Sequence, residues 1–168
     1  SHPEMIKLLA SRGADVNARG VIRQWERKVI TEPRPKDMNK GGFTPLLYAA
    51  RQGCVECARQ LIAAGADLDL EDPDRVTPLN MALLNLHFEL AAVLIKAGAD
   101  VNASNKAGAT ALLYASTFED KARLLINAGA DVKWQSKIGN TALILAARKP
   151  GNCRTVNLLL ERGANVNA

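Results

Sequence analysis

The strongest constraint on the fold of this 168-residue chain is an internal repeat. A motif that begins with threonine occurs four times, and its threonines stand 33, 33 and 31 positions apart: TPLLYAA at 44–50, TPLNMAL at 77–83, TALLYAS at 110–116 and TALILAA at 141–147. A second motif occurs five times: GADVNA at 13–18, GADLDL at 65–70, GADVNA at 98–103, GADVKW at 129–134 and GANVNA at 163–168. A unit of about 33 residues is too small to bury its own apolar face. The sequence therefore predicts a stack of similar units that share one continuous core.

Each repeat carries the signals of two helices. Thr44–Pro45 and Thr77–Pro78 are typical of a helix N-cap followed by proline in the first turn, where no amide donor is needed. The second helix has inward-facing pairs such as Leu94–Ile95 and ends at a glycine such as Gly98, which tolerates a left-handed conformation. Helices are therefore expected at residues 3–12, 45–51, 55–63, 78–84, 88–96, 111–116, 119–127, 142–149 and 153–161.

These motifs resemble those of the ankyrin repeat, in which T-P-L-H-x-A-A, G-H-x-E and G-A-D-V-N-A recur about every 33 residues. The resemblance covers nearly the whole chain apart from one inserted stretch, and it implies an all-α ankyrin-repeat solenoid of stacked helix pairs with short β-hairpin fingers. The chain departs from the pattern at the histidine of the first motif. Its four replacements are expected to lack the hydrogen bonds of that histidine: Leu47, Asn80, Leu113 and Ile144.

The repeat spacing also predicts the domain organisation, a single array. It is expected to comprise a partial repeat at 1–18, an inserted finger at 19–40 and repeats at 41–71, 72–104, 105–135 and 136–168. The insertion adds nineteen residues between Gly13 and Thr44 relative to the other repeats. Both ends carry incomplete repeats, so we expect the chain to be part of a longer array.

The insertion differs in composition from the rest of the chain. It contains seven basic and three acidic residues between Arg19 and Lys40, in a protein with a net charge of +5. Arginine and tryptophan dominate interface hot spots, so Arg23, Trp25, Arg27 and Lys28 are expected to contact a partner. An ordinary solvated loop stays open as the alternative interpretation.

A second set of candidates follows from the repeat register, which places finger tips and the ends of the first helices on the concave face. Trp134 adds an aromatic residue at a finger base. For each single position, a solvated side chain is the simpler interpretation, but together the set mixes apolar and basic groups. The partner-binding candidates on this face are Phe43, Arg51, Gln52, Leu84, Asn85, Trp134, Lys137, Arg148 and Lys149.

Each residue type that often takes part in catalysis or metal binding is interpreted here as structural. Cys54 and Cys57 form a lone C-x-x-C and are interpreted as small buried residues whose replacement the protein tolerates. Cys153 is also interpreted as a structural residue. Three cysteines are too few and too odd in number for a disulfide framework. His87 is interpreted as an ordered turn residue. Because the aspartates recur at the structural period, no unique catalytic constellation is expected, and neither a cofactor nor a metal site is predicted.

The predicted function is protein–protein interaction, because the ankyrin resemblance implies a binding module with a preorganised concave surface. The partner is expected to be a protein with an acidic or amphipathic surface. Two alternatives stay open: binding of nucleic acid or another anionic polymer through the basic insertion, and a structural repeat segment of a larger multidomain protein. No apolar run reaches the roughly 18 residues of a membrane helix, so no membrane insertion is expected. The compartment is not indicated; the cytoplasm is the default, and secretion or a periplasmic location stays open.

Overall fold

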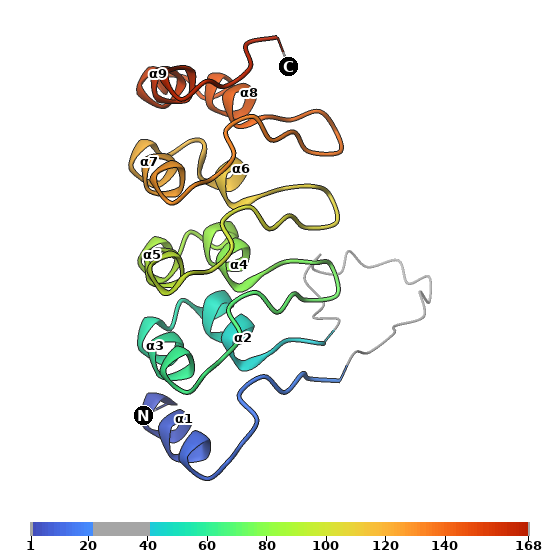
Figure 1. Cartoon of the computed structure of the whole chain (residues 1–168), viewed down its shortest axis with the longest axis vertical. Helices are drawn as coiled ribbons and strands as arrows, with labels where there is room; N and C mark the ends of the chain where they lie inside the picture. The colour runs from blue at the N-terminus through green and yellow to red at the C-terminus, as the bar shows by residue number, and fades with distance from the viewer. Residues whose placement is uncertain (1, 22–40, 168) are drawn as a thin grey trace, which may run out of the picture.

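The computed structural model of the chain describes residues 2–21 and 41–167. These residues form an elongated stack of helices in two rows, with loops that project to one side (Figure 1). The outer row contains α1 (His2–Ser11), α3 (Val55–Ala63), α5 (Phe88–Ala97), α7 (Glu119–Asn127) and α9 (Cys153–Glu161). The inner row contains α2 (Pro45–Gln52), α4 (Pro78–Leu84), α6 (Ala111–Ala115) and α8 (Ala142–Ala147). The prediction of an all-α solenoid of helix pairs is confirmed.

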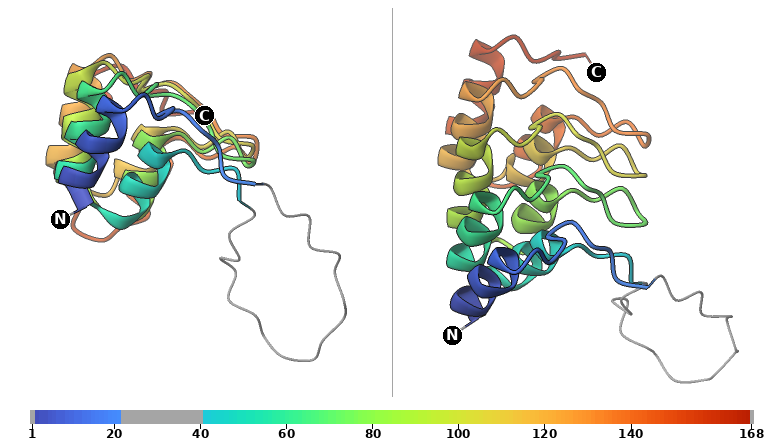
Figure 2. Two further views of the ribbon diagram at one scale, coloured as in Figure 1. Left: turned by 90° about the horizontal axis from the view of Figure 1, so that it is seen from below. Right: turned by 60° about the horizontal axis from the view of Figure 1, so that its bottom comes forward.

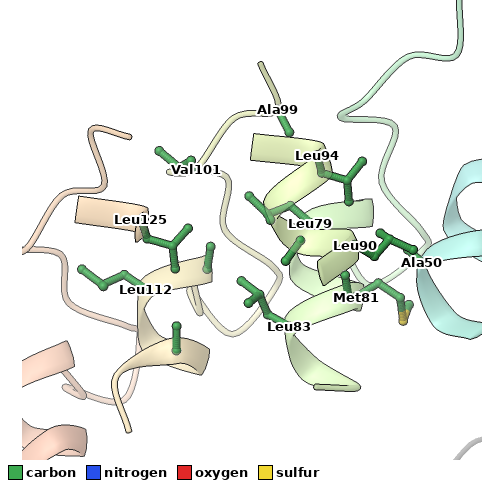
Figure 3. Packing of buried hydrophobic residues seen from close by; sticks show 14 of the residues in the cluster. Ala50, Leu79, Met81, Leu83, Leu90, Leu94, Ala99, Val101, Leu112 and Leu125 are labelled. Carbon is green, nitrogen blue, oxygen red and sulfur yellow. The ribbon is translucent and has the colours of Figure 1, made fainter. Parts of the chain in front are cut away.

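The core runs through the stack as a series of thin layers (Figure 3). Leucines such as Leu79, Leu94 and Leu125 are fully buried between the two rows. Alanines such as Ala50 and Ala82 are also fully buried, and their small side chains let neighbouring helices approach closely. From α2 to α9, each helix packs on its own partner and on the corresponding helix of a neighbouring repeat, and α1 packs on α3. The described core therefore depends on stacking, as the repeat length predicts.

Threonine caps three of the four inner helices. The Oγ1 atoms of Thr44, Thr77 and Thr141 accept hydrogen bonds from the backbone N–H three residues later, at 3.2–3.3 Å. Thr110 begins α6 with the same extended backbone but makes no side-chain cap bond. Its Oγ1 is buried and lacks a hydrogen-bond partner within the described residues. This defect lies in the repeat whose interhelical turn is two residues short in the sequence.

One expectation about the first motif is wrong. Asn80, which stands in place of the histidine in the second repeat, is buried and does make a side-chain hydrogen bond, to the end of its own repeat. Its Nδ2 donates to the carbonyl oxygen of Ala103 at 3.0 Å. An amide side chain therefore supplies a donor at a position where the sequence analysis expected none.

The two buried threonines provide a matched test of capping. Thr77→Val should lower the free energy of unfolding by about 1 kcal/mol, because it removes the cap of α4. Thr110→Val should leave stability unchanged or raise it slightly, because valine replaces a hydroxyl that is already buried without a partner. Urea denaturation followed by circular dichroism measures both. Equal losses in the two variants would contradict this account of α6.

Candidate functional site

The fingers project from the helices in one direction and lie one above another (Figure 2). Each tip among the described residues is a tight turn closed by backbone hydrogen bonds, for example Ser136 N–H to the Asn140 carbonyl at 2.9 Å and Asn105 N–H to the Ala109 carbonyl at 3.1 Å. Within the described ranges the fingers contain no extended strand, and one isolated antiparallel bridge joins Gln135 and Thr141. The expected hairpins are therefore turns rather than β-ribbons.

Hydrogen bonds also tie each finger to the next. Lys106 N–H donates to the Asp74 carbonyl at 3.0 Å, and Lys137 N–H donates to the Ala107 carbonyl at 3.2 Å. The indole Nε1 of Trp134 donates to the Gly108 carbonyl at 2.8 Å. A Cβ atom on Gly108 would lie 3.0 Å from the Lys137 backbone nitrogen, so glycine permits this close approach. The fingers thus form a connected layer.

The second sequence motif holds the other end of each finger. Its aspartate accepts a hydrogen bond from the backbone two residues later, as Asp15 does from Asn17 at 2.8 Å. Its asparagine reaches the next repeat: the Oδ1 of Asn17 accepts from Asp67 N–H at 2.8 Å. The Oδ1 of Asn102 accepts from Asp131 N–H at the same distance. The motif therefore builds a ladder of side-chain bridges between successive repeats.

Asp69 replaces asparagine in one rung of this ladder. Its Oδ1 accepts from Asp100 N–H at 3.0 Å. Partial burial raises the pKa of the Asp69 carboxyl, and the carboxylates of Asp100 and Asp67 raise it further, while the hydrogen bond from Asp100 N–H opposes the shift. The surroundings of Asp69 therefore destabilise the ionised form of its carboxyl group.

The inner helices and the fingers together form one face of the molecule, which we call the concave face. Seen from below, the fingers leave the helices at an angle, and the inner row lies inside that angle (Figure 2). Two rows of equivalent positions run along the inner helices, four and seven residues after each leading threonine. The first row is Tyr48, Met81, Tyr114 and Leu145, and the second row is Arg51, Leu84, Thr117 and Arg148.

Both tyrosines of the first row turn toward the fingers. The ring of Tyr48 lies against that of Phe43, with centroids 5.2 Å apart, and the guanidinium of Arg51 lies over the Phe43 ring at 5.9 Å. The hydroxyl of Tyr114 accepts a hydrogen bond from Asn105 Nδ2 at 2.8 Å. Burial and the nearby Asp72 carboxylate raise the pKa of Tyr114. This face therefore presents aromatic side chains with fixed orientations.

Several sequence candidates are held by contacts within the array. Phe43 is buried at the base of the first finger. Trp134 is half-buried and hydrogen-bonded to Gly108. Lys149 Nζ donates to the Thr117 carbonyl at 2.9 Å and lies 4.6 Å from the centroid of the Phe118 ring. These residues stabilise neighbouring repeats, so a role in binding would come in addition to a structural one.

Other candidates are exposed at the ends of the inner helices or at a finger tip. Leu84 is 53% exposed, and Asn85 beside it donates through Nδ2 to the Met81 carbonyl. The remaining exposed candidates are Gln52, Lys137 and Arg148. Arg23, Trp25, Arg27 and Lys28 lie outside the described residues.

The sequence analysis did not select the tyrosines of the first row. Tyr48 is 43% exposed, although it stands inside the otherwise buried TPLLYAA motif. The signal was available, because position 48 and its equivalent, position 114, both carry an amphipathic aromatic residue at a place where the repeat motif does not fix the residue type. Tyrosine is one of the residue types that are enriched at interface hot spots.

The interpretation of the cysteines is partly wrong. Cys57 is buried, as expected, but it forms a disulfide with Cys54. Cys153 was interpreted as a buried structural residue, whereas it is exposed with a free thiol. His87 is an ordered turn residue, as predicted: its Nε2 lies 3.2 Å from the Arg51 carbonyl.

In residues 2–21 and 41–167, no three histidine, cysteine or carboxylate side chains gather in a way that would hold a metal ion. Among the helices of the same ranges, none has the length and apolarity to cross a membrane.

Stacked helix pairs with aligned fingers define a repeat solenoid. A family model for ankyrin repeats, in three copies, matches residues 27–105 and 100–168. The chain therefore belongs to the ankyrin repeat family. Repeats of this family are generally protein–protein interaction modules and are typically not enzymes.

The chain is also similar to segments of curated proteins. It is 30% identical over 99 residues to the putative ankyrin repeat protein L371 of Acanthamoeba polyphaga mimivirus, covering 59% of this chain and 13% of the relative. It is 44% identical over 66 residues to the protein lin-12 of Caenorhabditis elegans, covering 39% and 5%. It is 34% identical over 71 residues to protein phosphatase 1 regulatory subunit 27 of Mus musculus, covering 42% and 46%. The matched segments span less than half of each of these relatives.

The Asp69 rung predicts a specific dependence of stability on pH. Because the pKa of Asp69 is raised on folding from its ordinary value of 3.8, the folded chain binds this proton more tightly than the unfolded chain. The resulting stabilisation is present below pH 3.8 and is lost as the pH rises through the folded-state pKa. Asp69→Asn should remove the contribution of this carboxyl to the pH dependence of the free energy of unfolding, while it keeps the Oδ1 acceptor. At pH 7 it should raise the free energy of unfolding by about 0.3 kcal/mol, a small value because solvent screens the charge.

Urea denaturation of the wild type and Asp69→Asn from pH 3 to pH 7 measures this difference. Asp131→Asn is a suitable comparison, since Asp131 stands at the aspartate position of the same motif in another repeat and is not among the carboxylates that raise the pKa of Asp69. A wild-type advantage at pH 7 would contradict the assignment.

Proposed function

We propose that the concave face binds an acidic, amphipathic segment of another protein. The observation that carries this proposal is the pairing of exposed apolar side chains with basic ones along the inner helices. Tyr48 and Leu84 provide apolar contacts on adjacent repeats, at 43% and 53% exposure. Arg51 and Arg148 occupy the same row as Leu84 at two other repeats. A partner that matches this row needs apolar side chains between carboxylates.

The charges of the fingers support the same kind of partner. Lys106 and Lys137 stand at the tips of consecutive fingers. Lys106 Nζ lies 3.6 Å from the Asp74 carboxylate of the preceding finger, whereas Lys137 is exposed at its tip. Lys137 is therefore the finger-tip charge that we propose meets a carboxylate of the partner. Complementary charge of this kind chiefly raises the rate of association and the specificity of binding.

The ordered fingers favour binding energetically. Each described finger is closed by its own backbone and joined to the next one, so a partner need not order these loops when it binds. Ordering of loops and side chains is one of the main free-energy costs of association. The concave face therefore resembles a preorganised surface rather than one formed on contact.

The inserted segment is the second part of the proposal. It supplies four of the proposed contacts, Arg23, Trp25, Arg27 and Lys28. The described residues on its two sides are joined by Gly20 N–H to the Phe43 carbonyl at 3.0 Å and by Gly42 N–H to the Gly20 carbonyl at the same distance. Both of these flanking segments belong to the finger layer that borders the concave face.

A selection from a displayed peptide library, with the full chain immobilised, tests the concave face. Enriched peptides should combine aspartate or glutamate with large apolar residues. The double variant Tyr48→Ala/Leu84→Ser should raise the Kd of such a peptide about tenfold or more, because it removes two central apolar contacts. Isothermal titration calorimetry measures the Kd.

The matched control lies on the outer row. Leu124 and Leu160 are exposed leucines of α7 and α9, and Leu124→Ser/Leu160→Ser should change the Kd less than about twofold. Equal losses in both double variants would contradict binding at the concave face. Duplex DNA is tested separately by titration at several salt concentrations. Specific use of the basic insertion for DNA would give a plot of log affinity against log salt concentration with a slope of about −0.9 for each phosphate contacted.

Two further variants test the insertion. Arg23→Ala/Arg27→Ala/Lys28→Ala should slow association with an acidic peptide and reduce its dependence on salt, with little change in stability. Trp25→Ala should instead speed dissociation, because a buried tryptophan contributes about 2 kcal/mol or more at an interface. Surface plasmon resonance at two salt concentrations separates the two effects. Rates unchanged in both variants would leave the insertion as a tolerated loop and would favour a purely structural role for this segment.

A further inference from the structure

The Cys54–Cys57 disulfide lies across the first turn of an outer helix. Cys54 is the N-cap residue of α3, and Cys57 follows in the first turn. We propose that this pair is a site of thiol–disulfide exchange with a low-molecular-weight thiol of the glutathione class. The proposal rests on three features of the described residues: the position of the sulfurs at a helix N-terminus, their unequal exposure, and the way the next repeat holds the turn.

The helix N-terminus favours a thiolate at Cys54. Cys54 Sγ lies 3.3 Å from the backbone nitrogen of Cys57 and accepts its N–H as the cap of α3. Once the disulfide opens, a negative sulfur at this place would keep that donor and the partial positive charge of the helix end. Placement at a helix N-terminus and in a C-x-x-C pair are two of the settings that lower the pKa of cysteine.

The two sulfurs differ in accessibility. Cys57 is 7% exposed and belongs to the core, next to the fully buried Ala58. Cys54 is half-buried in the turn between α2 and α3. An incoming thiolate therefore reaches the Cys54 sulfur first, and the Cys57 sulfur is the leaving group.

The reaction balances with two molecules of the small thiol. The first thiolate attacks Cys54 Sγ, the bond between the two cysteine sulfurs breaks, and Cys57 leaves as a thiolate that takes up a proton. Cys54 then carries a mixed disulfide. A second thiolate attacks the outer sulfur of that mixed disulfide and releases Cys54 as a thiolate. The protein gains two electrons and one proton, on Cys57, with a second proton taken up when the Cys54 thiolate is protonated, and two molecules of the small thiol are oxidised to one disulfide.

The neighbouring repeat fixes the turn that presents Cys54. The imidazole of His87 packs against Gly53, where a Cβ atom would lie 2.6 Å from His87 Nδ1. Gly53 has φ of 70°, and its N–H caps α2 through the Ala49 carbonyl. Because His87 Nε2 also contacts the Arg51 carbonyl, both sides of the turn are held. Cys54 is therefore presented from a fixed backbone whether or not the disulfide is closed.

Cys153 supplies an internal comparison. It is the first residue of α9, is exposed and has a free thiol. Val156 stands three residues after Cys153, at the spacing that separates Cys57 from Cys54, so Cys153 has no second cysteine beside it. Cys153 can therefore form a mixed disulfide but has no neighbour to resolve it.

The experiment uses the full chain with Cys153→Ser as the background. The protein is equilibrated in buffers of reduced and oxidised glutathione, its free thiols are alkylated, and the products are counted by mass spectrometry. We expect two alkylated thiols in reduced glutathione, none in oxidised glutathione, and a reversible change between these two states. In this background, Cys57→Ser should trap one glutathionyl group on Cys54 at least about tenfold faster than Cys54→Ser traps one on Cys57. Circular dichroism of each variant checks that the helices are retained.

Two outcomes would overturn the proposal. Both thiols could stay open to alkylation even in oxidised glutathione, which would show that the pair does not form a disulfide under exchange conditions. Alternatively, the two single variants could react at equal rates, which would show that Cys54 is not the attacked sulfur. The variant with Cys153 as its sole cysteine should give a mixed disulfide in the same buffers, and this control verifies that glutathionylation is detected.

Discussion

The structure depends on one packing constraint: no helix pair in this chain is large enough to enclose its own apolar side chains. Burial of apolar surface therefore takes place between repeats as well as within them. The seam is made of leucine and fully buried alanine, such as Leu94 and Ala82, so the layers are thin and the helices lie close together. Because each layer is thin, the array needs few aromatic residues, and those it has are available for the turns, the fingers and the surface.

The same constraint leaves the fingers without a core, so hydrogen bonds hold them. The ladder of Asn17, Asp69 and Asn102 joins the bases of the first three fingers to the next repeat, and backbone donors such as Lys106 N–H join the tips. The outcome is a face whose shape is set before any partner arrives. Function and stability here share the same bonds, since the contacts that connect repeats also position the side chains of the concave face.

The sequence was sufficient to predict the helices, because capping threonines and terminal glycines recur at a fixed period. Every predicted helix is present, with ends that agree to within about two residues. The sequence was less informative about side chains that make contacts far along the chain. Neither the bond from Asn80 to Ala103 nor the position of Lys149 over Phe118 follows from local pattern. The disulfide was missed for a related reason: in the repeat register, Cys57 stands where an aliphatic residue is normally buried, and this interpretation obscured the proximity of Cys54.

The bond from the Trp134 indole to the Gly108 carbonyl has an optical consequence. The chain contains two tryptophans, and the other, Trp25, lies in the insertion. A chain that lacks Trp25 would emit from a single indole, half-buried between the third and fourth fingers. The emission maximum of indole shifts with solvent contact and hydrogen bonding, so the fluorescence of Trp134 depends on the separation of these two fingers. One native side chain can thus report on the geometry of the face that we propose a partner binds.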